Sequence, residues 1–328
     1  TGSKPALPQI NGLKETGFIT SEDAVNLPHL PATIIILGGG PVAIEFAQIF
    51  SRFDTKVILL QRSDRVLPRE DVEISQHLLA YLKEQNIKVL TGVESYAVTK
   101  VGARKAVHFT VGKSKQTIAA DEIMVATGRQ PAINELNLAA AGVEFNNHGV
   151  KVNQFLQTTA KNIWAAGDIT GQLMYTHVAT YQGNLAGYNA IVEKPEAESL
   201  AVVPRTTFCE PEVASVGLTE TEAAKLGYRY EVGHLPIRYL GKLLIMGERR
   251  GLIKLLTQAK TGKIIGCHII APFASEIVHE VALAMQNGLT VDNIADTIHA
   301  YPSLAEGLAA VASEMALAKE LEKTKEAA

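Results

Sequence analysis

The chain has 328 residues and a formal net charge of −3, with 47% hydrophobic and 20% charged residues. These values are typical of a globular protein of about two or three domains, and no basic, aromatic-rich stretch indicates a nucleic acid or a membrane surface as partner. No apolar run reaches the roughly 20 residues of a transmembrane helix, and the N-terminus lacks a signal-peptide core, so we expect a cytoplasmic protein.

The cysteines and histidines show no pattern of a redox pair or a metal centre. Cys209 and Cys267 are too far apart in sequence for a C-x-x-C motif, and we expect both to be buried free thiols. The nine histidines show none of the spacings that are typical of metal ligands. We therefore expect no metal site.

A glycine-rich turn between an apolar strand and a helix is the first functional pattern. Residues 34–37, Ile-Ile-Ile-Leu, predict a buried parallel strand that runs directly into three glycines. Gly38 would make the tight turn, Gly40 would let the backbone approach a ligand, and the small Ala43 would let the helix 44–53 pack on the strand. The free N–H groups and the positive dipole end of that helix favour the pyrophosphate of a dinucleotide, although ordinary βα corners share such turns.

A second apolar strand, 56–60, follows at the spacing of a βαβ unit and ends at Gln61 and Arg62, where the adenine ribose of a dinucleotide would lie. A carboxylate at this point binds the ribose 2′-hydroxyl of NAD and repels a 2′-phosphate. Here Gln61 replaces it, with Arg62 beside it and Arg65 and Arg69 close behind, so we favour NADP, while NAD stays possible. The alternative is a solvated loop in which these arginines pair with neighbouring acids.

The segments that follow keep the alternation of helices and strands that is typical of α/β proteins. We predict a helix at 71–85 and strands at 88–90, 107–111 and 122–126. After a polar linker near 193–199, the pattern indicates a separate domain. Its expected strands lie at 205–208, 229–235, 251–257 and 264–270, and its expected helices at 274–287 and 303–321.

Two short segments share a corner of threonine, glycine and proline. Gly128 lies in the corner 127–131, at the carboxyl end of the strand 122–126, where open α/β sheets bind ligands. The residues 1–5, Thr-Gly-Ser-Lys-Pro, are similar to it. The repetition indicates two homologous halves.

Several segments together resemble the flavin-dependent pyridine nucleotide-disulfide oxidoreductases, the family that includes mercuric reductases and dihydrolipoamide dehydrogenases. The segments are the opening Thr-Gly corner, the glycine turn with Glu45 in its helix, 126–129, 163–168 and 211–217. The resemblance implies an α/β fold with a Rossmann-like NAD(P)-binding domain at 33–147. It also implies the remnant of an FAD-binding domain at 1–32, its remainder at 148–200, and an α+β dimerisation domain at 201–328 that forms a homodimer.

The resemblance also assigns cofactor contacts. Gly167 and Asp168 would hold the ribityl and pyrophosphate region of a flavin, and the helix that contains Ala179 would approach its isoalloxazine ring. Glu45 would face the nicotinamide amide, although an exposed helix acid is an ordinary alternative. From the residues alone, Asp168 can accept hydrogen bonds from sugar-like hydroxyls, or it is a plain turn residue.

Near the C-terminus the family carries His-Pro-Thr-x-x-Glu, where the histidine shuttles protons and the glutamate orients it. This chain has Tyr301 and Glu306 at those positions, and we take both as catalytic candidates. Tyrosine titrates near about 10, so Tyr301 is a poor general base at neutral pH. Mercuric reductases are similar in having a tyrosine there, which suggests a phenol lining the acceptor site. His299 would point the same way as Tyr301 if the backbone between them is extended.

The resemblance implies an FAD-dependent NAD(P)H oxidoreductase in which hydride passes from the nicotinamide to flavin and electrons go on to a small disulfide or metal-ion acceptor. The family places an FAD-binding half and a Cys-x4-Cys pair before the point at which this sequence begins. We therefore expect a fragment or one piece of a split enzyme, with an incomplete FAD site and little activity by itself. The alternative is a non-catalytic nucleotide-binding or dimerisation module.

Overall fold

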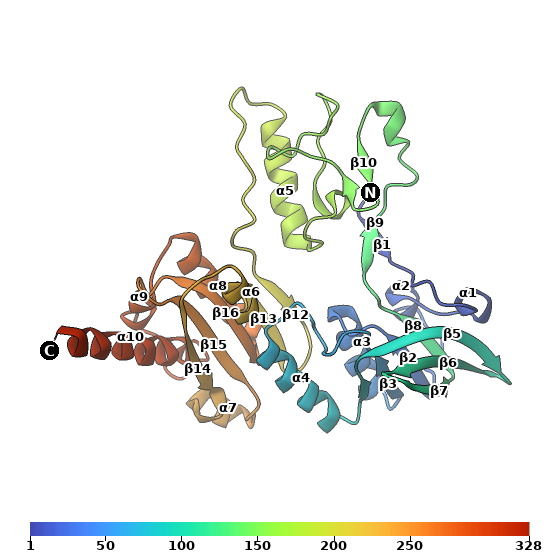
Figure 1. Ribbon diagram of the computed structural model, residues 1–328, viewed down its shortest axis with the longest axis horizontal. Helices are drawn as coiled ribbons and strands as arrows, with labels where there is room; N and C mark the ends of the chain where they lie inside the picture. Colours follow the sequence, from blue (N-terminus) through green and yellow to red (C-terminus); the bar gives the residue numbers. More distant parts are fainter. Residues whose placement is uncertain (328) are drawn as a thin grey trace. The chain divides into compact units, whose positions relative to one another are not determined.

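The computed structural model describes residues 1–327. The chain divides into two compact units, each formed by two stretches of sequence. One comprises Thr1–Ile10 and Val125–Ala201, and the other comprises Asn11–Met124 and Val202–Ala328. Both contain helices and strands, so the predicted α/β class is confirmed (Figure 1). The four-part division of the chain at 32, 147 and 200 stays a prediction.

The larger unit begins with two short helices, α1 (Leu13–Thr16) and α2 (Ser21–Ala24), and continues with a four-stranded sheet in the order β4-β3-β2-β8. Strands β2, β3 and β4 are parallel, because each returns to the sheet through a helix. Residues 34–36 of β2 are fully buried, as an apolar run covered on both faces must be. The bounds are β2 (Thr33–Leu37), α3 (Pro41–Arg52), β3 (Lys56–Leu60), α4 (Val72–Glu84), β4 (Lys88–Leu90) and β8 (Glu122–Val125). The predicted strands 34–37 and 56–60 and the predicted helices are confirmed.

A three-stranded antiparallel sheet is inserted before β8. It consists of β5 (Val93–Val101), β6 (Arg104–Val111) and β7 (Ser114–Ala120), each paired with the next. The sequence predicted only the part of β6 at 107–111. The outer strands were missed because much of their length is exposed, so their apolar periodicity is weak.

The C-terminal part of the same unit is a five-stranded antiparallel sheet in the order β12-β13-β16-β15-β14. Helices α8 and α10 pack on one face, and α4 contacts β16. The residues between sheet and helices form a large apolar core that includes Ile253, Ile269, Val281 and Leu308. The strand bounds are β12 (Arg205–Thr207), β13 (Glu212–Gly217), β14 (Tyr230–Pro236), β15 (Leu252–Gln258) and β16 (Ile264–Ala271). The helices are α6 (Glu220–Lys225), η3 (Ile237–Tyr239), α7 (Gly241–Met246), α8 (Ala274–Gln286), α9 (Val291–Ala295) and α10 (Glu306–Ala327).

The smaller unit joins the two similar corners of the sequence. Strand β1 (Ser3–Pro5) pairs antiparallel with β9 (Arg129–Pro131), and Lys4 lies opposite Gln130, its equivalent in the repeated pattern. The flanking bonds are also equivalent, since Ala6 N donates to Gly128 O and Ala132 N to Gly2 O, both at 2.9 Å. The two corners are thus related by a local two-fold axis. The rest of this unit contains η1 (Leu138–Ala141), β10 (Phe145–Asn146), β11 (Gly149–Val150), η2 (Gly167–Thr170) and α5 (Thr176–Asn189).

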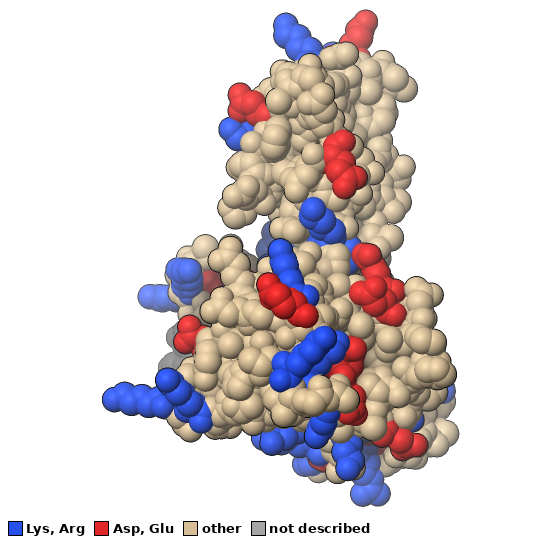
Figure 2. All heavy atoms as spheres, turned by 90° about the vertical axis from the view of Figure 1, so that its right-hand side faces the viewer, with Lys and Arg blue, Asp and Glu red and all other residues tan. Residues whose placement is uncertain are grey.

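Two surface properties bear on partners. Among residues 1–327, no helix combines the length and the apolar character that crossing a bilayer requires. Basic and acidic side chains are interspersed over the face drawn in Figure 2.

Candidate functional site

The glycine turn adopts the strand–turn–helix geometry that its spacing predicts. Gly38 has φ +124°, a conformation reserved for glycine, and its N–H donates to Leu60 O at the end of β3. Gly40 is the N-cap of α3, Pro41 occupies the first helical position, and Ala43 is fully buried against the strand. A Cβ built on Gly40 would meet no atom within 4 Å, so the space in front of the turn is open.

The residues at this turn fit a dinucleotide phosphate. The first turn of a helix leaves backbone N–H groups without partners inside the helix, and here the N–H groups of Val42 and Ala43 lie in that turn. The helix dipole adds positive potential at the same point. An anion can approach because no side chain fills the space beyond Gly40.

Gln61 lies behind the turn instead of projecting from it. It is 6% exposed, and a Cβ on Gly39 would lie only 2.9 Å from its side-chain carbons. Its Nε2 donates to Arg65 O at 3.2 Å, and its Oε1 accepts from Arg62 N at 3.1 Å. The side chain of Gln61 therefore braces the following loop against the glycine turn, which explains why the middle residue of the turn is also glycine.

The three arginines of this loop differ in their surroundings. Arg62 and Arg69 are exposed. Arg65 is folded onto the loop, where it donates to Pro68 O at 3.0 Å and lies 3.6 Å from Asp64 Oδ1, while its buried Nε has no partner among the described residues. Arg62 and Arg69 are thus the two guanidinium groups that a bound anion could reach directly.

The acids that follow the loop are not part of a solvated cluster. Glu70 and Asp71 are 8% and 2% exposed, and they bind Arg205 and Lys254 of the C-terminal sheet. The alternative prediction, in which the loop arginines pair with these two acids, is therefore wrong for both. The ion pair of Asp64 with Arg65 is the part of that alternative that the structure contains.

Glu45 binds the main chain of the C-terminal part. Its Oε1 accepts a hydrogen bond of 2.8 Å from the backbone N–H of Phe208. Burial raises the pKa of Glu45, and the bond from Phe208 opposes this effect without cancelling it. One and two turns further along α3, Gln48 and Arg52 bind Glu210. The prediction of a plainly exposed helix acid is wrong, and a role at the nicotinamide stays a prediction.

In the smaller unit, the structure brings Gly167, Asp168 and Ala179 together. Gly167 has φ +77°, and a Cβ there would lie 2.9 Å from that of Ala179 on α5. Asp168 Oδ2 accepts a bond of 2.5 Å from the hydroxyl of Ser3, which itself accepts from Arg129 Nε at 2.6 Å. Asp168 is thus placed to bind hydroxyl groups, and the bare backbone at Gly167 permits close approach, as a flavin site requires.

Two further features describe the surroundings of this turn. The residues before Gly167 form no strand, because Trp164 makes only an isolated bridge to Gln157. The buried Gln182, which the sequence did not single out, accepts a 2.6 Å bond from Gly167 N and so fixes the turn. Gly128 has φ +124°, is exposed and has open space where a Cβ would lie.

The two C-terminal candidates, Tyr301 and Glu306, have different surroundings. Tyr301 is 80% exposed, whereas Glu306 accepts a 2.7 Å bond from Ser303 N and its own N–H donates to Ser303 Oγ at 3.4 Å. Glu306 therefore begins α10 with reciprocal capping bonds. A role of Tyr301 and Glu306 at the acceptor side stays a prediction.

His299 has a partner that sequence reasoning missed. Its Nε2 lies 2.9 Å from Glu280 Oε1 on α8, and its Nδ1 lies 2.8 Å from Thr297 O. The side chain of His299 is 7% exposed, unlike that of Tyr301, so the two do not point the same way. No local pattern links Glu280 to His299, because they come from different elements.

Glu280 also lines an open surface pocket of about 450 Å³, together with Lys242, Phe273, Pro302 and Ser303.

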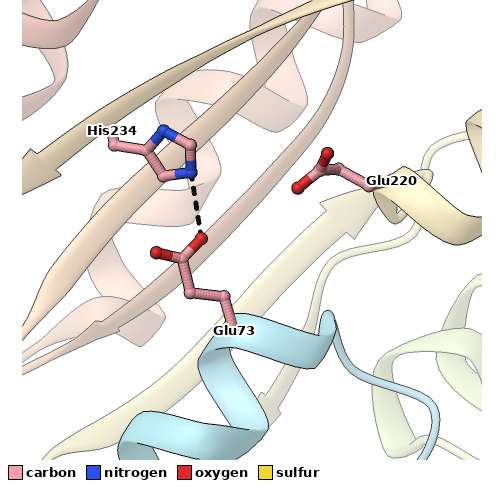
Figure 3. Close-up of side chains that lie close together, drawn as sticks. All are labelled: Glu73, Glu220 and His234. Atoms are coloured by element: carbon pink, nitrogen blue, oxygen red, sulfur yellow. Dashed lines mark hydrogen bonds and ion pairs between the residues drawn. The ribbon is translucent and has the colours of Figure 1, made fainter.

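Glu73, Glu220 and His234 are the described residues whose ligand atoms lie close enough to hold a metal ion, within 4.8 Å of one another (Figure 3). Glu73 Oε2 lies 2.9 Å from His234 Nε2. The ammonium group of Lys254 lies 3.2 Å from Glu73 Oε2 and also pairs with Glu220. The chain itself therefore supplies the cation that these carboxylates require.

Comparisons with known proteins agree with this geometry. The model of the pyridine nucleotide-disulphide oxidoreductase family matches residues 1–183, and that of its dimerisation domain matches residues 203–312. The chain is 38% identical to a mercuric reductase of Lysinibacillus sphaericus, over 94% of this chain and 57% of the relative. It is 34% identical to a dihydrolipoyl dehydrogenase of Bacillus subtilis, over 96% of this chain and 67% of the relative.

Solved structures show the same fold. The HOCl-induced flavoprotein disulfide reductase RclA of Escherichia coli superimposes with a TM-score of 0.88 at 29% identity, covering 95% of this chain and 72% of that one. LpdA of Mycobacterium tuberculosis gives 0.86 at 28% identity, covering 96% and 68%. The chain thus spans little more than half of the first mercuric reductase and about two thirds of the other relatives. With its family model, its relatives and its glycine turn in agreement, the chain belongs to the pyridine nucleotide-disulphide oxidoreductase family.

Proposed function

We infer that this chain provides the nicotinamide-nucleotide site and the dimerisation domain of an FAD-dependent NAD(P)H oxidoreductase of the disulfide or mercuric reductase type. The observation that carries the inference is the open space in front of Gly40 at the start of α3, in a strand–turn–helix unit of a parallel sheet. In this site the N–H groups of the turn bind the pyrophosphate, and no side chain competes for the position.

Arg62 and Arg69 favour NADP over NAD. Both are exposed in the loop that follows the end of β3, the point at which the adenine ribose lies in this kind of fold, and Gln61 carries no charge that would repel a 2′-phosphate. Guanidinium groups bind phosphate oxygens strongly and in a bidentate manner. Titration of the protein with NADPH and NADH tests this choice, and tighter binding of NADH would overturn it.

Gly167, Asp168 and Ala179 would hold part of a flavin, with Asp168 on its hydroxyl groups. A flavin bound there would supply the capacity to take hydride from the nicotinamide and to deliver electrons to a disulfide or metal-ion acceptor. This chain's residues supply orientation: Glu45 on the nicotinamide side, and Tyr301 as an exposed phenol at the acceptor side. Glu306, whose carboxylate accepts a hydrogen bond from Ser303 N, caps the start of α10.

The C-terminal part would form a homodimer. Its surface exposes several large apolar side chains that a second copy can cover, among them Ile298 at 98% and Ile245 at 73% exposure. The family model of the dimerisation domain spans the same part of the chain. The second candidate function is a nucleotide-binding or dimerisation module without redox activity. Purified protein that is yellow and bleaches with NADPH in the absence of oxygen supports the enzyme, whereas colourless protein that binds NADPH supports the module.

The variant Gly40→Ala tests the nucleotide site directly. Its Cβ enters open space at an ordinary negative φ, so the fold should tolerate it, but the methyl group occupies the path of the phosphates. We expect NADPH affinity to fall by at least about tenfold with little change in melting temperature, as for loss of a close backbone contact. Gly187→Ala on α5 is the matched control, because a Cβ there also meets no atom within 4 Å. Unchanged NADPH binding by Gly40→Ala would contradict the proposed site.

A further inference from the structure

One residue from each strand of the C-terminal sheet lies in a single row across one of its faces. The register places Arg205 opposite Ser215, Ser215 opposite His268, His268 opposite Lys254, and Lys254 opposite His234. Directly opposite residues on neighbouring strands point to the same face of a sheet. We call these five residues the polar row.

The polar row has acidic partners at the start of α4. Arg205 Nε donates to Glu70 Oε1 at 2.9 Å, and the fully buried Ser215 donates from its hydroxyl to Glu70 Oε2 at 2.6 Å. Both oxygens of Glu70 are therefore bound by the sheet. With the side chains of Arg205 and Glu70 20% and 10% exposed, little water competes for this pair.

Lys254 forms the centre of the contact. Its Nζ donates to Asp71 Oδ1 at 2.8 Å, and both side chains are only 2% exposed. Burial disfavours both charges, but their hydrogen bond and mutual attraction outweigh it, so the pKa of Asp71 is lowered and that of Lys254 is raised. At the end of the row, His234 Nε2 lies 2.9 Å from Oε2 of Glu73, which belongs to the first turn of α4.

The acids held by the polar row are continuous with the loop of exposed arginines. Glu70 directly follows residues 62–69, and its N–H donates to Leu67 O at 2.9 Å. The N–H of Leu67 in turn donates to Gly39 O in the glycine turn at 2.7 Å. Leu67 is buried and has φ +42°, so its conformation depends on these neighbours. A connected set of hydrogen bonds thus runs from the sheet to the turn.

We propose that Arg205 and Lys254 are positioning residues for the nucleotide: by holding Glu70 and Asp71, they fix the loop that presents Arg62 and Arg69 to the adenosine phosphate. The proposal rests on the proposed function for the identity of the ligand. It assigns a role in nucleotide affinity to residues of the C-terminal sheet that do not contact the nucleotide. Without these bonds the loop keeps its attachments at Gln61, Ser63 and Leu67 but loses the one at its acidic end, so its arginines, Arg69 above all, sample more positions.

Arg205→Gln tests the proposal through two measurements, hydrogen exchange without nucleotide and NADPH titration. We expect faster exchange of the amides in 62–69 and roughly tenfold weaker NADPH binding, the effect of losing one well-placed charged contact. Arg205→Lys, which keeps the charge, should recover part of both. Arg250→Gln is the matched control. It breaks a partly buried ion pair, in which Arg250 Nη2 lies 2.6 Å from Glu248 Oε2, and this pair lies outside the loop.

Unchanged exchange in 62–69 for Arg205→Gln overturns the proposal, as does an equal change in the Arg250→Gln control. If Arg205→Gln does not fold, Glu70→Gln repeats the test, since the amide keeps an acceptor for Ser215 and loses the pairing charge. The exchange measurement needs no nucleotide, so it tests the positioning role even if wild-type protein binds neither NADPH nor NADH. That last result would contradict the proposed function instead.

Discussion

Glu45 Oε1 and the backbone N–H of Phe208 form a hydrogen bond of 2.8 Å that joins the helix after the glycine turn to the C-terminal sheet. Glu45 is partly buried, and its raised pKa reflects that burial. The bond uses the carboxylate that family resemblance assigns to the nicotinamide. A nucleotide that contacts Glu45 would therefore meet a side chain already fixed by the protein.

Glu45→Gln should change the pH dependence of stability. Because the folded-state pKa of Glu45 lies above its unfolded value, its ionisation costs stability as the pH rises through the folded pKa. Glutamine keeps an acceptor for Phe208 and removes this cost. We expect the variant to equal wild type at about pH 4 and below and to be more stable than wild type at higher pH. Urea unfolding at several pH values measures the difference, and the exposed Glu135→Gln serves as control; a pH-independent difference would contradict the assignment.

The two cysteines should be inert in the folded protein. Burial raises the pKa of Cys209 to about 12 and raises that of Cys267 as well, so neither forms the reactive thiolate near neutral pH. We expect Ellman's reagent to titrate no thiol in native protein and both thiols in concentrated guanidinium chloride. Rapid reaction of either cysteine in native protein would contradict the burial of that thiol.

Lys254→Met should destabilise the protein strongly. It leaves the buried Asp71 without its counter-charge, a change that costs about 3–5 kcal/mol. Since the folded-state pKa of Asp71 is lowered, its stabilisation is present above the unfolded pKa of about 3.9 and is lost as the pH falls through the folded value. The gap between variant and wild type should therefore narrow in acid. Lys319→Met, which removes a more exposed pair with Asp292, should cost about 1 kcal/mol or less; equal losses in denaturant unfolding would be inconsistent with the buried contact.

Gly167→Ala should cost more stability than Gly128→Ala. Both glycines have positive φ, which costs about 1–3 kcal/mol for another residue. Gly167 has the added clash with Ala179, whereas Gly128 has open space. Adding Ala179→Gly to Gly167→Ala should restore part of the loss, and thermal unfolding of the two single variants and the double variant measures the coupling. Additive effects would mean that Gly167 and Ala179 do not touch.

Local patterns predicted the elements that local interactions make. The apolar run 34–37, three glycines and an amphipathic helix form β2, the turn and α3, because strand burial, positive φ and helix capping depend on neighbours in sequence. The strand β3 has the bounds that the sequence predicts. Exposed strands such as β7 were not predicted, because their sequences show little of the alternation of apolar and polar residues that marks a half-buried strand.

The sequence by itself determined the glycine turn, the arginine loop and the family to which they point, because each depends on residue types at fixed short spacings. Only the tertiary structure decided that Glu306 caps a helix, that Glu280 pairs with His299, and that five residues from five strands form one row against α4. Those contacts depend on strand order and register, which bring together residues as distant as Glu70 and Arg205. No local periodicity encodes such pairing, because it depends on burial and charge complementarity between segments that are far apart in sequence.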